Sequence, residues 1–210
     1  MADSLMIPAQ LPVMTLAEVV FFPHITVPLY LFEQRYQQML DDTLDSERIF
    51  VLACRDPQQS AFPDCEDSPH PVATAGIIRS CKRNPDGTAN LMLQGLARVL
   101  IKSMVPESPY PLADLETLNS KSGAEDAELD DQRSTTERLI LENLQGNNMD
   151  THQIIDTLNQ MQDPEVFLDC AASILCQDVS TKQQLLEEFN VNLRFHKFIQ
   201  YLEEEHDLLC

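Results

Sequence analysis

Three prolines interrupt an apolar stretch near the start of the chain, residues 11–30, with the sequence LPVMTLAEVVFFPHITVPLY. Proline has no backbone N–H group, so it cannot donate a hydrogen bond within a central sheet ladder. Pro12, Pro23 and Pro28 therefore exclude one long central strand here. The β-branched and aromatic residues between them favour short strands joined by tight bends.

The hydrophobic period changes after this stretch. Phe32, Tyr36, Met39 and Leu40 are spaced three and four residues apart, and glutamine and aspartate fill the positions between them. This spacing predicts an amphipathic helix of about three turns. We expect Phe32, Tyr36 and Met39 to bury one face of that helix against a sheet.

A β-hairpin is predicted in the middle of the chain. Two strand-like segments, residues 72–83 and 89–105, are separated by the sequence NPDGT. Asn, Pro, Asp and Gly in this order suit a type I turn in which Gly87 takes a positive φ. Gly95, inside the second strand, predicts a bulge or a close backbone approach.

Further strands are predicted on both sides of the hairpin. Residues 49–55, IFVLACR, have the apolar run of a buried strand, and residues 110–118 predict one more. The prolines and acids of residues 56–71 indicate a loop. The first part of the chain, residues 1–118, is therefore predicted to be rich in β-structure.

The second part of the chain has a helical pattern. Residues 119–134 are mostly small, polar or acidic, and they predict an acidic linker. Residues 135–210 then predict four or five short helices with brief connections, which is typical of a compact antiparallel bundle. Within it, Phe195, Phe198, Ile199 and Leu202 have the helical spacing of core residues.

Two helix starts in this part carry local signals. Asp163, Pro164 and Glu165 have the N-cap, first-turn proline and early acid of a helix start. Ser180 and Gln183 form a candidate capping box.

The charge of the chain restricts its partners. The formal net charge is −20, with 8 basic and 15 acidic side chains in residues 1–118 and 6 and 19 in residues 119–210. Such a field repels polyanions, so it argues against nucleic acid and anionic membranes. The acidic segments 125–131 and 203–207 are expected to be solvated surface, with attraction of a basic partner as the alternative.

No targeting or membrane-spanning segment is evident. The first residues, MADSLMIPAQLPVM, lack a basic region, and nowhere does an apolar run approach the roughly 20 residues that span a bilayer. The six cysteines are sparse and irregularly spaced, which indicates reduced thiols. These features predict a cytoplasmic protein.

Cysteine and histidine are the candidate reactive residues of this sequence. Cys54 with His24 or His70 is a possible nucleophile and base, but Cys54 occupies the place of a small apolar residue, so a structural role is expected. Cys65, His70 and Cys81 form no C-x-x-C pair, and the common phosphate-binding and hydrolase motifs are absent. We therefore expect no catalytic residue, no metal and no cofactor.

Residues 11–40 closely resemble the start of the Lon protease N-terminal, substrate-binding domain family. The hairpin is also similar to that family, in its glycines, its PDG turn and its G-x-x-R step. His24 departs from the family pattern, which has glycine there, and Gln34 and Thr15 stand at positions of proline. The matching positions, expected to be structural, are Pro12, Phe22, Pro23, Pro28, Phe32, Glu33, Arg35, Tyr36, Met39, Gly76, Gly87, Gly95 and Arg98.

The resemblance implies an α+β fold: a β-rich, PUA-like pseudo-barrel with one packed helix, followed by a C-terminal helical bundle. In the full protease this region recognises unfolded or tagged substrates. The ATPase and Ser-Lys peptidase modules of that protease are not found in this sequence, so we expect a stand-alone binding module and no enzyme. Glu33, near the helix start, is expected to pair with Arg35 or Arg98 and so tie the helix to the hairpin.

We therefore predict a module that holds unfolded or tagged polypeptide, or another protein, or that acts as an adaptor in protein quality control. A groove between the β-rich half and the bundle is the expected surface, with four candidate residues: Phe21, His24, Met92 and Met104. One alternative is RNA binding by basic residues of the 76–102 hairpin, namely Arg79, Lys82, Arg83, Arg98 and Lys102. Another is a thiol enzyme that uses Cys54.

Overall fold

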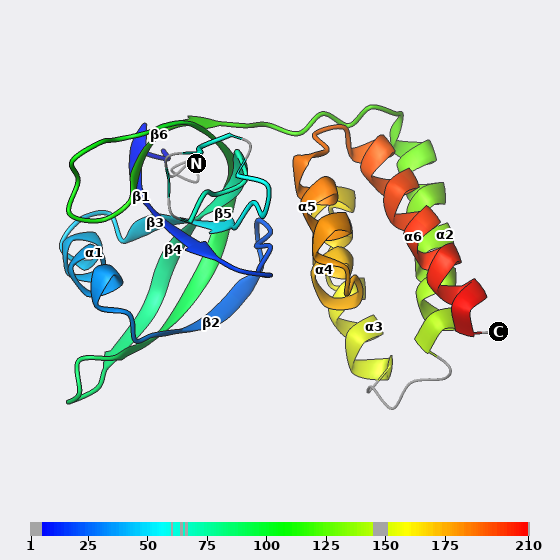
Figure 1. The fold of residues 1–210 in the computed structure, drawn as a ribbon. Coiled ribbons are helices and arrows are strands. Elements are labelled where there is room, and N and C mark those ends of the chain that lie inside the picture. Colours follow the sequence, from blue (N-terminus) through cyan, green and yellow to red (C-terminus); the bar gives the residue numbers. More distant parts are fainter. Residues whose placement is uncertain (1–5, 60, 64, 66, 145–150, 210) are drawn as a thin grey trace. The chain divides into compact units, whose positions relative to one another are not determined.

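The computed structural model describes residues 6–59, 61–63, 65, 67–144 and 151–209. These residues form two compact units: unit 1 ends at Leu118, and unit 2 begins at Asn119. Unit 1 contains a mixed sheet and one helix, and the described part of unit 2 contains helices (Figure 1). The fold is therefore of the α+β type.

The elements of unit 1 follow the predicted order. The short strands and the single helix are β1 (Gln10–Leu16), β2 (Thr26–Leu31), α1 (Gln34–Leu44), β3 (Ile49–Cys54), β4 (Val72–Arg83), β5 (Ala89–Met104) and β6 (Leu112–Thr117). The prediction that the proline-interrupted stretch forms short strands is confirmed, since β1 and β2 both lie in it.

The strand pairings close into a ring. The order is β2-β5-β4-β3-β1-β6, and β5 also pairs with β6, so β5, β4, β3, β1 and β6 are joined in a circle. β1 and β3 are parallel, and the other pairs are antiparallel. Among the described residues β2 pairs with β5 alone, which makes β2 an edge strand. Pro28 is tolerated there because an edge strand leaves one side of its backbone unpaired.

Apolar side chains fill both faces of the central strands. Val13 and Val51 belong to one buried cluster, whereas their neighbours Met14 and Leu52 belong to a second cluster that also contains Tyr36 of α1. β3 is buried along its whole length. A strand covered on both faces has a continuous apolar sequence, which explains the run IFVLAC.

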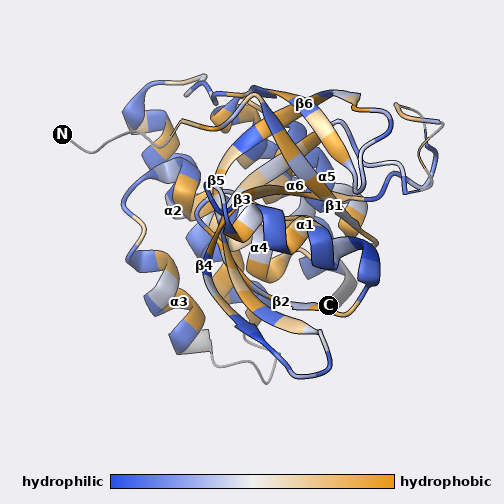
Figure 2. Cartoon of the chain, turned by 90° about the vertical axis from the view of Figure 1, so that its left-hand side faces the viewer, coloured by the Kyte–Doolittle hydropathy of each residue, from blue (hydrophilic) through white to orange (hydrophobic). Residues whose placement is uncertain are grey.

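The hairpin turn has the predicted geometry. Gly87 has a φ of +86°, and its N–H group donates to the carbonyl of Asn84 at 3.1 Å. Asn84 in turn donates to the carbonyl of Thr88 at 2.8 Å. The tip of this hairpin is hydrophilic (Figure 2).

Gly95 lies against the chain that precedes β2. The N–H group of His24 donates to the Gly95 carbonyl at 3.0 Å, and the Gly95 N–H group donates to Ile25 at 2.8 Å. A Cβ atom at residue 95 would overlap the carbonyl oxygen of Phe22. The predicted close backbone approach is confirmed, and the register between β4 and β5 also shifts here.

Helix α1 buries Tyr36 and Met39, as predicted, but the prediction for Phe32 is wrong. The side chain of Phe32 is 64% exposed, whereas those of Tyr36 and Met39 are 1% and 0% exposed. Phe32 precedes the first helical residue, Gln34, so it does not follow the helical period. It continues the two-residue alternation of β2 and therefore points outward.

Unit 2 is built around two long helices and three shorter ones in its described part. α4 packs against the other four helices, and α6 also packs against α2 and α5. Phe167, Phe195 and Phe198 are fully buried, which confirms the core role of the last two. The helices are α2 (Asp126–Leu144), α3 (Thr151–Asn159), α4 (Pro164–Leu175), α5 (Val179–Glu187) and α6 (Val191–Leu209).

The predicted linker, residues 119–134, is helical from Asp126 onward, so this part of the prediction is wrong. The buried positions at the start of α2 are Leu129, Gln132 and Thr136, which have helical spacing. Two of them are polar, and Thr136 donates to the carbonyl of Gln132 at 2.8 Å. The apolar stripe that would have predicted the helix is therefore missing from the sequence.

One predicted helix start is confirmed, and the other is corrected. Asp163 caps α4 by accepting hydrogen bonds from the N–H groups of Glu165 and Val166. Helix α5 is capped by Asp178, which accepts from Thr181 at 2.6 Å, and not by Ser180. Ser180 lies inside the helix, where the predicted capping box with Gln183 cannot form.

Candidate functional site

The outward face of β2 carries exposed aromatic residues. Exposure alternates along the strand, so that Pro28 and Tyr30 face outward while Leu29 and Leu31 face the core. Phe32 extends this alternation beyond the end of the strand. The rings of Tyr30 and Phe32 stack with their centroids 6.1 Å apart, and 55% and 64% of the two side chains are exposed.

The neighbouring strand β5 adds Met92 to this face. Met92 is in register with Pro28 of β2, and it is 37% exposed. We call the surface formed by Pro28, Tyr30, Phe32 and Met92 the aromatic edge. Exposed apolar residues that lie together mark candidate interaction sites, so the aromatic edge is the first candidate for binding.

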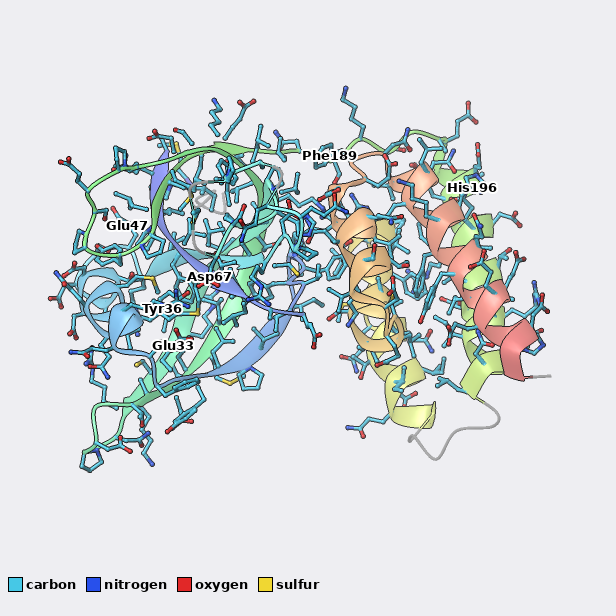
Figure 3. All side chains as sticks on the ribbon, viewed as in Figure 1. Glu33, Tyr36, Glu47, Asp67, Phe189 and His196 are labelled. Carbon is cyan, nitrogen blue, oxygen red and sulfur yellow. The ribbon has the colours of Figure 1, made fainter. Side chains whose placement is uncertain are left out.

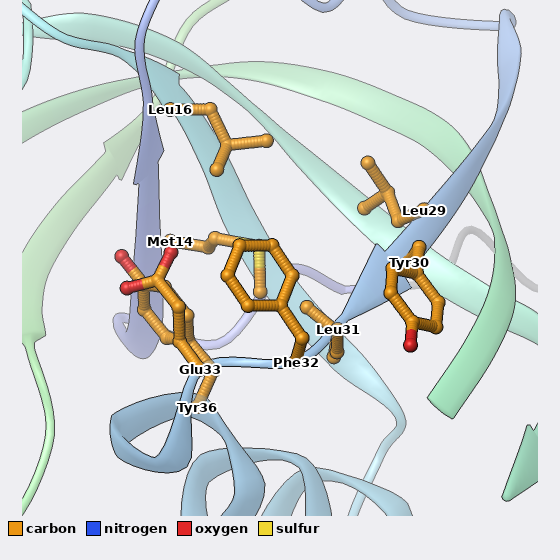
Figure 4. Close-up of a pocket in the computed structure, with 8 residues that line it drawn as sticks. All are labelled: Met14, Leu16, Leu29, Tyr30, Leu31, Phe32, Glu33 and Tyr36. Carbon is orange, nitrogen blue, oxygen red and sulfur yellow. The ribbon is translucent and has the colours of Figure 1, made fainter. Parts of the chain in front are cut away.

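Small hollows adjoin the aromatic edge. One, of about 350 Å³, is lined by Pro28, Tyr30, Lys82 and Met92 together with their strand neighbours. Another, of about 40 Å³, lies beneath Phe32 and is lined mainly by apolar side chains. Figure 4 shows the ring of Phe32 between Tyr30 on one side and Glu33 and Tyr36 on the other.

A larger groove of about 830 Å³ also lies in unit 1. Its lining includes Arg35 and Tyr36 of α1, Phe62, Met104 and Tyr110. The proline-containing segment 105–111 forms one wall. Met104, predicted as a binding residue, therefore lies in a groove, although this groove is within unit 1.

The start of α1 is held by charged side chains beside this groove. Arg35 Nε lies 2.7 Å from Glu33 Oε2, and Arg35 Nη1 lies 2.5 Å from Asp67 Oδ2. Figure 3 labels Glu33, Tyr36 and Asp67 in unit 1. The guanidinium also lies 4.7 Å from the centre of the Tyr36 ring. Burial raises the pKa of the Tyr36 hydroxyl, which donates to the carbonyl of Thr15 at 3.4 Å.

The predicted pairing of Glu33 with Arg35 is confirmed, but it does not tie α1 to the hairpin. Glu33 is the N-cap residue of α1 and makes no capping hydrogen bond with its side chain. Arg35 connects it to Asp67, in the segment between β3 and β4. A carboxylate so far along the chain was not recognised from the sequence, because an ion pair leaves no periodic signal.

The candidate binding residues separate into exposed and buried ones. Phe21 is 2% exposed and belongs to the core, so its prediction as a surface residue is wrong. His24 is exposed and has a φ of +66°, the conformation that the more usual glycine would adopt easily. Met92 lies on the aromatic edge and Met104 in the large groove. Tyr30 was missed, although its two-residue spacing from Pro28 and Phe32 was visible in the sequence.

The five basic residues of the hairpin do not form one exposed basic face. Arg98 is only 3% exposed, Arg83 pairs with Asp41, and Lys102 Nζ lies 2.8 Å from Glu116 Oε2. Arg79 and Lys82 remain on the outward face of β4. A continuous row of five cations for an RNA backbone is therefore not formed, and the RNA-binding alternative gains no support.

The thiol of Cys54 is not activated. It is 4% exposed, and burial raises its pKa, whereas a nucleophilic cysteine needs a lowered one. The Sγ atom lies 3.8 Å from the carbonyl oxygen of its neighbour Arg55. These observations oppose the thiol-enzyme alternative.

Metal binding and membrane spanning also find no support in the described residues. No group of three or more His, Cys, Asp or Glu side chains in that part of the chain is arranged to hold a metal ion. None of the helices described is long and apolar enough to cross a membrane.

Known proteins resemble the chain over nearly its whole length. Residues 10–204 match the model of the family described as ATP-dependent protease La (LON) substrate-binding domain. The Lon protease of Buchnera aphidicola subsp. Schizaphis graminum is 26% identical over 200 residues, which cover 95% of this chain and 26% of that protein. The Lon protease of Escherichia coli K12 is 25% identical over 204 residues, covering 95% and 25%. The chain thus spans about a quarter of the length of these relatives.

Solved structures show the same fold. The N-terminal domain of a Mycobacterium avium complex Lon protease superposes with a TM-score of 0.71 at 20% identity, covering 94% of this chain and 98% of that one. A Lon N-terminal domain protein from Xanthomonas campestris gives 0.65 at 18% identity, covering 91% and 98%.

Proposed function

The chain belongs to the ATP-dependent protease La (LON) substrate-binding domain family, and from this we propose that unit 1 binds unfolded polypeptide segments at the aromatic edge. The observation that carries the proposal is the stacked pair of Tyr30 and Phe32, both more than half exposed. Unfolded chains differ from folded ones in exposing apolar side chains. A surface that offers aromatic rings and a methionine is suited to bury such side chains without a fixed sequence.

The hollows beside the aromatic edge support this proposal. An apolar side chain of the client gains most when it leaves water on several sides at once. The hollow of about 350 Å³ provides such a place next to Tyr30 and Met92. Met92 has an unbranched side chain, which adapts to client side chains of different shapes.

We propose that recognition uses side chains and not the addition of a strand to β2. A peptide that extends a sheet needs backbone N–H groups along the edge strand. Pro28, in the middle of β2, has none, so it interrupts that row of donors. Side-chain contact with the outward face remains available.

The test is the affinity for a permanently unfolded client. We would measure binding of a reduced, carboxymethylated, fluorophore-labelled protein by fluorescence anisotropy. The double variant Tyr30→Ser/Phe32→Ser should weaken binding by about tenfold or more, because two aromatic contacts are removed. Since both residues are exposed, the variant should keep the melting temperature of the wild type within a few degrees.

The matched control is Leu141→Ser/Leu193→Ser in unit 2. These two leucines are 43% and 48% exposed, so the control also removes two exposed apolar side chains. It should bind the client as tightly as the wild type. Equal affinities for all three proteins, or no binding of the client by the wild type, would show the proposal to be wrong.

We also propose a fold type, a non-catalytic role and an adaptor activity for this chain. The closed ring of strands is of the PUA-like type, the chain acts without catalysing a reaction, and it serves as an adaptor that passes its client to a protease. Adaptor activity predicts that adding the chain to a Lon protease speeds degradation of the unfolded client. The Tyr30→Ser/Phe32→Ser variant should lose that acceleration.

A further inference from the structure

Two cations stand beside the aromatic edge on the same face of the sheet. Lys82 is in register with Asn90 of β5, which is in register with Tyr30 of β2. Ser80, Met92 and Pro28 form the adjacent row. The outward face therefore changes from apolar on β2 to cationic on β4.

Arg79 belongs to the same face. It lies at a register shift between β4 and β5, and its Nε atom donates to Gln94 Oε1 at 2.6 Å. Gln94 is in register with Thr26 on β2. The guanidinium of Arg79 is thus held over β5, beyond Met92, while Lys82 lines the hollow of about 350 Å³.

These two cations differ in their partners from four other cations of unit 1. Arg35, Arg55, Arg83 and Lys102 each lie near a carboxylate. Among the described residues neither Arg79 nor Lys82 has a carboxylate partner. In a chain with a net charge of −20, two cations free of such partners next to an exposed apolar surface are a local exception.

We propose that the aromatic edge selects apolar segments flanked by acidic residues. This inference rests on the proposed function and names its preferred client. The apolar part of the client covers Tyr30, Phe32 and Met92, and its carboxylates lie near Lys82 and Arg79. The charge of the rest of the chain repels a long polyanion, but it permits one or two carboxylates at this position.

The geometry also gives the spacing in the client. Lys82 and Tyr30 lie two strands apart, which is about 10 Å at the usual distance between strands. An extended peptide advances about 3.3 Å per residue. The acidic residue is therefore expected about three residues from the apolar one, in a peptide that crosses the strands.

The test compares three fluorescein-labelled peptides with one apolar core. They carry glutamate, serine or lysine about three residues from that core. At about 0.1 M salt, the wild type should bind the glutamate peptide roughly two- to tenfold more tightly than the serine peptide, and the lysine peptide more weakly still. At about 1 M salt this preference should vanish, because exposed charges are then screened.

Variants assign the preference to these two residues. Lys82→Glu should remove the preference, Arg79→Glu/Lys82→Glu should reverse it in favour of the lysine peptide, and Lys82→Arg should retain it. Lys121→Glu, which makes the same charge change at an exposed lysine of unit 2, should leave it unchanged.

The outcomes separate the two proposals. If all three peptides bind with equal affinity, the charge preference is wrong and the proposed function stands. If none of the peptides binds, the proposed function itself fails. If a single-stranded oligouridine binds the wild type as tightly as the glutamate peptide does and competes with it, the face is a nucleic-acid site and the inference is overturned.

Discussion

Arg194 and Asp169 form an ion pair in which both side chains are fully buried, with Arg194 Nη1 3.0 Å from Asp169 Oδ1. The guanidinium also donates hydrogen bonds to the Glu165 carboxylate, to the Ser120 hydroxyl at 2.9 Å and to the carbonyl of Glu188 at 2.8 Å. It therefore joins α6 to α4, to the segment before α2 and to the connection between α5 and α6. A buried charge needs such partners, because water is not available to solvate it.

Removing one member of this pair should strongly destabilise the protein. Asp169→Ala leaves the Arg194 charge buried without its fully buried counterion, so the free energy of unfolding should fall by about 3–5 kcal/mol. Urea unfolding followed by circular dichroism measures this. Arg138→Ala breaks an exposed pair with Glu142 and should cost less than about 0.5 kcal/mol. Similar losses in the two variants would contradict the role assigned to burial.

The two glycines of the β4–β5 hairpin should respond differently to asparagine. Gly87 needs only a positive φ, which asparagine accepts, so Gly87→Asn should cost about 1 kcal/mol or less. Gly95 lies against the backbone of Phe22, so Gly95→Asn and Gly95→Ala should each cost about 1–3 kcal/mol or prevent folding. Denaturant unfolding provides the comparison. If asparagine were tolerated at both positions, the close approach at Gly95 would not limit the fold.

Phe32 and Tyr36 should separate binding from stability. Tyr36 is 1% exposed, and Tyr36→Ala should lower the free energy of unfolding by about 3–5 kcal/mol. Phe32→Ala removes an exposed ring and should change it by about 0.5 kcal/mol or less, while weakening client binding. Thermal melts and client titrations on the same samples measure both effects. If Phe32→Ala destabilised the protein as much as Tyr36→Ala, the assignment of Phe32 to the exposed surface would be wrong.

Stability should fall at alkaline pH. Burial raises the pKa values of Cys54, Cys170 and Cys176 in the folded protein. Below the ordinary thiol pKa, about 8.5, folded and unfolded chains hold the same thiol protons. Above it the unfolded chain loses those protons first, so the free energy of unfolding decreases as pH rises toward the folded-state pKa values.

Urea unfolding at neutral pH and at about pH 9.5 measures this decrease. Cys54→Ala should show a smaller decrease than the wild type. Alkylation of the native protein provides a control, since Cys65 is partly exposed and should react before Cys54 does. A stability that rose between the two pH values would have the wrong sign for buried thiols.

Local patterns in the sequence predicted local structure well. The NPDGT turn, the cap at Asp163 and the buried strand β3 each depend on neighbouring residues, and the structure contains all three. The expected helix also lies where the period of Tyr36 and Met39 places it.

The errors arose where a residue serves an element other than the one its spacing suggested. Phe32 fits the helical spacing of Tyr36, but it belongs to the alternation of β2. Gln132 and Thr136 occupy buried helix positions that apolar residues usually take, so the start of α2 was not recognised. Arg98 was expected to be a surface cation, but it is only 3% exposed. Its burial depends on contacts with residues far away in the chain, which the local sequence does not reveal.

The amino-acid sequence by itself determined the order of the elements, the turns and caps, and the membership of the family, because these follow from periodicity and from backbone preferences over a few residues. Tertiary structure alone decided which aromatic rings are exposed to water and which cations have no carboxylate partner. It also decided that Arg35 pairs with Asp67. The physical reason is that exposure and ion pairing depend on strand register and on contacts between residues far apart in the chain. The aromatic edge exists because the outward face of β2 stays exposed at Tyr30 and Phe32 continues that face beyond the strand.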